Sequence, residues 1–108
     1  MVLTLVILSQ LSLAAAADSA ALIDTERQDE LMRLLRHDCG SCHGMTLKGG
    51  LGPALTREAM AARPVEYLYN TVRDGHPGTP MPPWRGILTD AEIHWLVTQL
   101  RSGIPSPW

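Results

Sequence analysis

Two cysteines and a histidine stand together in the segment "HDCGSCHGM", residues 37–45, where their types and spacing could hold a metal or a cofactor. Cys39 and Cys42 are separated by two residues, His43 follows directly, and the chain has no other cysteine. Four kinds of chemistry use such residues: thiol–disulfide exchange, zinc binding, a structural disulfide and covalent haem attachment.

The first three kinds fit this sequence poorly. A redox-active cysteine pair is typical of a βαβ setting, and no strand pattern is found in the chain. A zinc site needs four ligands, whereas this motif offers three within five residues and no second pair follows it. A disulfide across two intervening residues closes a very small loop and therefore adds little stability.

Covalent haem attachment explains the spacing of the motif. Two cysteine sulfurs must reach two fixed points on the porphyrin edge, and the next residue must then fall beneath the iron. We therefore predict one covalently bound haem c, with Cys39 and Cys42 as the anchors and His43 as the proximal iron ligand.

A second iron ligand has to come from elsewhere in the chain. The available methionines and histidines are Met45, Met60, Met81, His37, His76 and His94. Those beside the motif cannot cross to the other face of the haem, and those in expected helices are more typical of packing or edge positions. Met81 and His76 remain, both in the proline-rich segment 76–87. Prolines on both sides of Met81 would hold its thioether in place, which favours Met81 as the ligand and leaves His76 as the alternative.

Hydrophobic periodicity and capping residues predict four helices and no strand, hence an all-α protein. The helices are expected over residues 24–38, 56–62, 64–75 and 88–103, with N-terminal caps or capping boxes at Thr25, Thr56 and Thr89, and glycines at their ends at Gly75 and Gly103. The apolar positions expected to share a face are Ile23, Leu31, Leu34 and Leu35 in the first helix and Ile93, Leu96, Val97 and Leu100 in the last.

The first residues of the chain resemble a secretory signal peptide. An apolar run over residues 2–13 is followed by small alanines, although no lysine or arginine precedes Arg27. We expect residues 1–17 to be cleaved on export and residues 18–108 to form a single domain. The alternative is an uncleaved membrane anchor, for which the apolar run is short.

The charge of the chain excludes some functions. A net charge of −2 gives no indication of nucleic-acid binding. Residues 43–87 hold five basic and three acidic side chains, which is either ordinary solvated surface or a mildly positive docking face suggested by Arg57, Arg73 and Arg85. No paired carboxylates or Ser/His/Asp set stand at a spacing typical of catalysis, so we expect an electron carrier and no enzyme.

The segments "CGSCH", "GPAL", "MPPW" and "LTDAEIHWL" occur in the order found in class I c-type cytochromes, which the sequence resembles. This resemblance implies a fold whose N- and C-terminal helices cross beside the haem. It also implies that the Pro53 carbonyl bonds His43, that Leu55 packs on the haem and that Met81 is the distal ligand. Trp84 would lie at the end of a loop that borders the exposed edge of the haem.

A narrower pattern, "DCGSCHGMTLKGGLGPALT" with "GTPMPPWRGILTD", resembles the small c-type cytochromes encoded with cytochrome cd1 nitrite reductase in denitrifying bacteria. This resemblance implies a monomeric periplasmic carrier, without stable membrane association once the signal is removed. Its partner would be cytochrome cd1 nitrite reductase or another periplasmic redox protein. The alternatives are an accessory factor in haem d1 maturation and, more weakly, a peroxidase-like enzyme in which Met81 leaves the iron.

Overall fold

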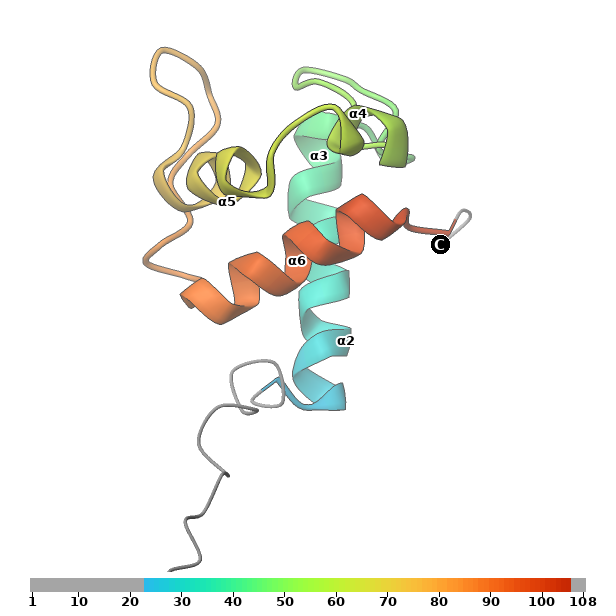
Figure 1. Ribbon diagram of the computed structural model, residues 1–108, viewed down its shortest axis with the longest axis vertical. Helices are drawn as coiled ribbons and strands as arrows, with labels where there is room; N and C mark the ends of the chain where they lie inside the picture. The colour runs from blue at the N-terminus through green and yellow to red at the C-terminus, as the bar shows by residue number, and fades with distance from the viewer. Residues whose placement is uncertain (1–22, 106–108) are drawn as a thin grey trace, which may run out of the picture.

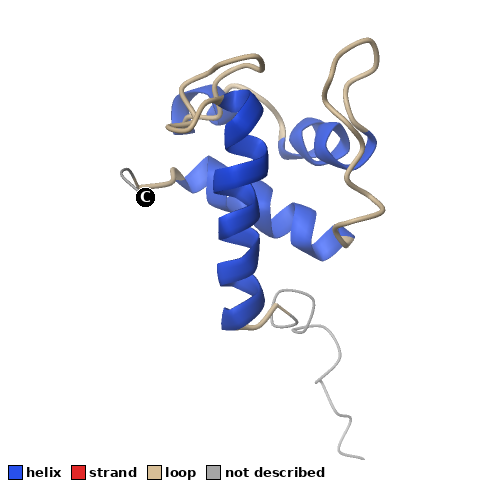
Figure 2. Cartoon of the chain, turned by 180° about the vertical axis from the view of Figure 1, so that it is seen from behind, coloured by secondary structure: helices blue, strands red, loops and turns tan. Residues whose placement is uncertain are grey.

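The computed structural model of the protein describes residues 23–105. Over these residues the chain consists of helices and loops without a strand (Figure 2), which confirms the predicted all-α fold. The elements are α2 (Thr25–Leu34), the π-helical η1 (Leu35–Cys39), α3 (Gly40–His43), α4 (Arg57–Ala61), α5 (Val65–Asp74) and α6 (Asp90–Ser102). The expected signal peptide, residues 1–17, lies outside the described residues.

Polar caps fix where the helices begin. Thr56 and Thr89 cap α4 and α6 as predicted, each accepting a hydrogen bond from a backbone N–H three residues on. The cap predicted at Thr25 is wrong, because Thr25 is already helical and the preceding Asp24 accepts from the Arg27 N–H at 2.8 Å. Asp24 has extended backbone angles and a carboxylate, which suit an N-cap better than the first helical position.

A π-helical turn joins α2 to α3, and the sequence pattern did not predict it. Helices α2, η1 and α3 follow each other without a break over residues 25–43. Leu35 at the start of η1 and Gly40 just after it are both buried. A π-turn holds more residues than an α-turn, so it changes the face on which the following segment projects. The cysteine motif therefore projects from a different face than a straight α-helix would give it.

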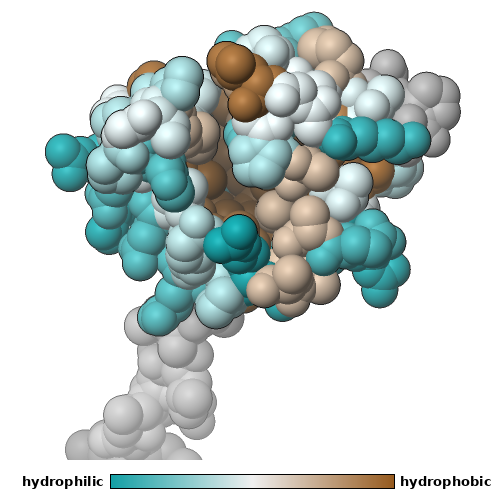
Figure 3. Space-filling view, turned by 90° about the horizontal axis from the view of Figure 1, so that it is seen from above, coloured by the Kyte–Doolittle hydropathy of each residue, from teal (hydrophilic) through white to brown (hydrophobic). Residues whose placement is uncertain are grey.

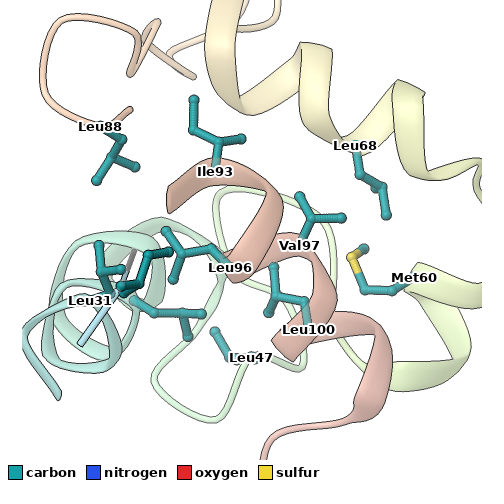
Figure 4. Packing of buried hydrophobic residues seen from close by; sticks show 11 residues of the cluster. Leu31, Leu47, Met60, Leu68, Leu88, Ile93, Leu96, Val97 and Leu100 are labelled. Carbon is teal, nitrogen blue, oxygen red and sulfur yellow. The ribbon is translucent and has the colours of Figure 1, made fainter. Parts of the chain in front are cut away.

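Helix α6 packs across α2, and α4 and α5 pack against α6 (Figure 1). The buried side chains form one cluster around α6 (Figure 4), and its members are Ile23, Leu31, Leu35, Leu47, Met60, Leu68, Leu88, Ile93, Leu96, Val97 and Leu100. The predicted stripe of α6 is thus confirmed in full. In the first helix Leu34 is only partly buried, whereas the other three predicted positions belong to the core.

The C-terminal end of α4 is closed by a side chain from α6. Arg101 Nη1 donates to the carbonyl oxygens of Met60 at 3.2 Å and of Arg63 at 2.6 Å. This guanidinium adds hydrogen bonds to carbonyls at and just after the end of α4 and so ties α6 to α4.

An ion pair fastens α2 to α6 at their crossing. Arg27 Nε donates to Glu92 Oε2 at 2.9 Å, and Glu92 is buried. Because Glu92 is engaged here, only the threonine half of the predicted Thr89–Glu92 capping box forms.

Replacing Arg27 by alanine should lower the free energy of unfolding by about 1–2 kcal/mol, because a buried carboxylate then loses its charged partner. Arg33→Ala removes an exposed arginine from the same helix and should change stability by less than about 0.5 kcal/mol. Denaturant unfolding of both variants at neutral pH measures the difference, and equal losses would contradict the assigned role of the ion pair.

Between residues 23 and 105, the structure contains no helix with the length and apolar character needed to cross a membrane.

Candidate functional site

The imidazole of His43 is held in a defined orientation. Its Nδ1 lies 2.7 Å from the carbonyl oxygen of Pro53. A carbonyl oxygen can only accept, so Nδ1 carries the proton and the neutral ring keeps a lone pair at Nε2 for a metal. Such a hydrogen bond to the far nitrogen both orients a histidine ligand and makes it a stronger donor.

Loop backbone packs directly against this ring. A Cβ added to Gly52 would lie 2.7 Å from His43 Cε1 and 2.8 Å from Nδ1, so only glycine fits at this position. The Gly52 N–H donates to the Cys42 carbonyl at 2.7 Å, and the Gly49 N–H donates to the His43 carbonyl at 2.8 Å. The loop 44–53 is therefore bonded to the motif that precedes it.

Cys39 and Cys42 are free thiols, both partly buried. Burial raises the pKa of the Cys39 thiol to about 11, and the nearby Asp38 carboxylate adds to the effect. In the described part of the chain, His, Cys, Asp and Glu side chains form no cluster of three that could bind a metal ion. Cys39 and Cys42 with His43 supply three of the four ligands that a zinc site needs.

The loop that carries Met81 is anchored on α5. Its Trp84 and Arg85 N–H groups donate to the Val72 and Arg73 carbonyls at 3.0 and 3.2 Å, at the C-terminal end of that helix. Within the loop, the Met81 carbonyl accepts from the His76 N–H at 3.2 Å. Met81 is half-buried, while the side chain of His76 is exposed.

The other methionines and histidines considered for the iron lie in unsuitable places. Met60 is buried in the core, 5% exposed, and Met45 is 56% exposed. His94 stacks on Tyr69 with the ring centroids 4.0 Å apart, and His37 is exposed beside the motif. The assignment of Met81 as the second ligand stays a prediction.

Apolar side chains left half-buried border this region. Leu55 and Trp84 both pack against the core while remaining partly open to solvent. Seen from above, the side that carries both loops has a hollow whose visible floor is apolar (Figure 3). Two free thiols, an oriented imidazole and an apolar hollow together fit a covalently attached haem.

Two of the arginines that suggested a positive docking face form ion pairs with an acidic residue. Arg73 and Arg85 both approach Asp74, at 2.8 and 3.7 Å. The hydrogen bond with Asp74 raises the pKa of Arg73 and lowers the pKa of Asp74. Nearby, the Asp90 carboxylate raises the pKa of Tyr69 by hydrogen bonding. The α5 side thus carries less net charge than its arginines alone indicate.

Comparisons with known proteins agree with this chemistry. The family model described as "Cytochrome C oxidase, cbb3-type, subunit III" matches residues 26–98. Cytochrome c55X of Stutzerimonas stutzeri is 53% identical over 95 residues, which span 88% of this chain and 80% of that protein. The chain belongs to this family of c-type cytochromes. It is therefore an electron carrier that binds haem c covalently.

Two solved structures resemble the chain. The c-type cytochrome NirC is 54% identical, with a TM-score of 0.71 over 73% of this chain and 93% of that one. The dihydro-heme d1 dehydrogenase NirN in complex with DHE is 32% identical, with a TM-score of 0.63 over 69% of this chain but only 16% of NirN. The first likeness confirms the predicted class of cytochrome, and the second shows that part of a dihydro-haem d1 dehydrogenase has the same fold.

The sequence did not predict two structural features that shape the site. The packing of Gly52 on His43 was not predicted, although the glycine-rich "GGLGP" could have signalled a close approach of backbone. The π-turn over Leu35–Cys39 has no such signal, because the sequence of this segment contains no proline or glycine to mark a change of helix type.

Proposed function

We propose that this cytochrome is a monomeric periplasmic protein with one haem, which it uses to pass single electrons to cytochrome cd1 nitrite reductase in denitrification. Cys39 and Cys42 form the thioether bonds, His43 is the proximal ligand and Met81 the distal ligand. When bound, the haem supplies a one-electron redox couple. The observation that carries the proposal is the His43–Pro53 hydrogen bond, which leaves Nε2 available for iron.

The two sides of the site have different tasks. His43 donates through Nε2, and Pro53 keeps the ring from rotating. Met81, carried by its bonded loop, would supply the second ligand, which would leave a substrate no open site at the iron. A thioether opposite an imidazole also raises the reduction potential, which suits a protein that receives and delivers electrons.

The resemblance of residues 1–17 to a signal peptide supports the periplasmic assignment, because c-type haem is attached outside the cytoplasm. The likeness to NirC over 93% of that chain supports the link to nitrite reduction.

A second candidate function is a role in haem d1 maturation. It is favoured by the likeness to part of NirN, whose own name describes a dihydro-haem d1 dehydrogenase. The same haem would then exchange electrons during cofactor synthesis, with no change in the residues that hold it.

Stopped-flow mixing separates the two candidates. Reduced protein is mixed with oxidised cytochrome cd1 nitrite reductase, and we expect oxidation faster than the turnover of the reductase. Absence of transfer on that timescale would overturn the donor role and favour haem d1 maturation.

A peroxidase role is tested in parallel. Wild type should lack peroxidase activity, and a Met81→Ala variant should gain it because a coordination position at the iron becomes open.

A further inference from the structure

The loop that carries Met81 runs from the end of one helix to the start of another. It leaves α5 after Asp74 and enters α6 at Asp90 (Figure 1). A loop of this kind moves through changes at the few residues where it joins its helices. The position of Met81 therefore depends on how firmly the C-terminal end of α5 and the N-terminal end of α6 are held together.

A pair of stacked rings joins these two helix ends. The imidazole of His94, one turn into α6, lies on the ring of Tyr69 in α5, with the centroids 4.0 Å apart and the planes at 9° to each other. His94 is exposed and Tyr69 is half-buried, so the pair lies at the surface, outside the buried cluster. A ring pair in contact contributes stability beyond the area that it buries. The His94–Tyr69 stack therefore fastens the start of α6 to α5.

Charged side chains extend this contact toward the loop. The Arg73 guanidinium carbon lies 5.3 Å from the centroid of the Tyr69 ring. Arg73 pairs with Asp74 at 2.8 Å, and Asp74 also approaches Arg85 of the loop at 3.7 Å. From the α6 side, hydrogen bonding to the Asp90 carboxylate raises the pKa of Tyr69. Tyr69 thus contacts α6 on one side and, on the other, the arginine whose partner reaches the loop.

The loop backbone is bonded to α5 at the same place. The Val72 and Arg73 carbonyls, which accept the Trp84 and Arg85 N–H groups, lie within about one turn of Tyr69. Only residues 86–89 then separate this attachment from the first residue of α6. A shift of α5 relative to α6 must therefore strain this short connection, break the two hydrogen bonds or displace the loop.

We propose that His94 is a positioning residue for Met81. Its ring, stacked on Tyr69, holds the ends of α5 and α6 together and thereby keeps the Met81 loop in place. In its effect at the iron, this inference rests on the proposed function, in which Met81 is the distal ligand. Its effect on the hydrogen bonds of the loop is independent of that assignment.

The first test is hydrogen exchange of the Trp84 and Arg85 amides, measured by NMR on the reduced haem-bound protein. His94→Ala removes the ring, and we expect it to lower the protection of both amides about three- to tenfold, as the loss of a ring pair does. His94→Phe supplies another ring to stack on Tyr69 and should restore protection to within about twofold of wild type.

Thr98→Ala is the matched control for His94→Ala. Thr98 is exposed on the same helix one turn later, and its hydroxyl donates only to the His94 carbonyl of that helix. Protection in this variant should stay within about twofold of wild type. Equal protection in wild type and His94→Ala would overturn the positioning role. An equal fall at the Val97 amide in the core of α6 would also overturn it, because the loss would then be global.

The second test is binding of imidazole to the oxidised iron, followed by absorbance. Imidazole needs the position that Met81 occupies, so its apparent affinity rises with the fraction of molecules in which Met81 has left. We expect His94→Ala to bind imidazole about three- to tenfold more tightly than wild type, and His94→Phe and Thr98→Ala to bind within about twofold of it.

The sulfur-to-iron charge-transfer band of the oxidised wild type separates the two possible failures. If wild type lacks the band, ligation by Met81 is overturned, and amide protection alone decides whether His94 holds the loop. If wild type has the band and His94→Ala leaves the imidazole affinity unchanged, Met81 is the ligand and the positioning role of His94 is overturned.

Discussion

Replacing Gly52 by alanine should disturb the proximal side of the haem, because the added methyl group meets the His43 ring. The added Cβ would lie 2.7 Å from His43 Cε1 and 3.3 Å from Nε2, so the ring has to shift. Overpacking of this kind typically costs about 1–3 kcal/mol. We expect that loss in thermal or denaturant unfolding of the haem-bound protein, together with a lower yield of covalently bound haem.

Gly86→Ala is the matched control for this experiment. A Cβ at Gly86 meets no atom within 4 Å, and neither glycine has a φ in the left-handed region. The control should therefore stay within about 0.5 kcal/mol of wild type. Equal behaviour of the two variants would contradict the conclusion that Gly52 backbone supports the His43 ring.

Replacing Gly75 by alanine should displace the loop that carries Met81, again because the added methyl group meets neighbouring atoms. Gly75 has φ +75°, and a Cβ there would lie 2.7 Å from the Met81 carbonyl oxygen and 2.9 Å from Pro82 and Pro83 backbone atoms. The loop would have to move away from α5, carrying Met81 with it. We expect the sulfur-to-iron charge-transfer band of the oxidised protein to weaken and the reduction potential to fall, because thioether ligation raises it.

Gly78→Ala is the matched control for Gly75→Ala, because both glycines have a positive φ. Gly78 has φ +80° in the same loop, but a Cβ there would meet nothing within 4 Å. Gly78→Ala should cost about 1 kcal/mol from the left-handed conformation alone and keep the band. Gly75→Ala should cost about 1–3 kcal/mol more. A band of full intensity in Gly75→Ala would show that the methionine loop does not depend on this contact.

Local signals in the sequence were sufficient for most of the fold. Thr56 and Thr89 place two helix starts correctly because a cap acts on a backbone N–H only three residues away. The apolar stripe predicted for α6 identified its buried face correctly for a similar reason, because the periodicity of apolar residues depends on a single helix. The site motif was equally local, with Cys39, Cys42 and His43 in five residues.

Contacts between distant segments could not be predicted in this way. The Arg27–Glu92 pair joins residues 65 positions apart, and nothing near either residue names its partner. A charge count likewise did not show that Arg73 and Arg85 pair with Asp74, although Arg73 is its neighbour in the sequence. The close approach of Gly52 to His43 likewise depends on how the loop folds back.

The crossing of α2 and α6 brings together two helices from opposite ends of the described chain. Buried residues of α6 supply much of the core, and the helix that they pack across lies near the other end of the described chain. A core closed by contacts of such large sequence separation forms slowly, because a long loop must first be closed. Until α6 arrives, α2 and η1 have little to pack against, and Cys39 remains accessible to reagents in solution. We therefore expect both thiols to be open to haem before α6 packs, whereas Cys39 is partly buried in the folded protein.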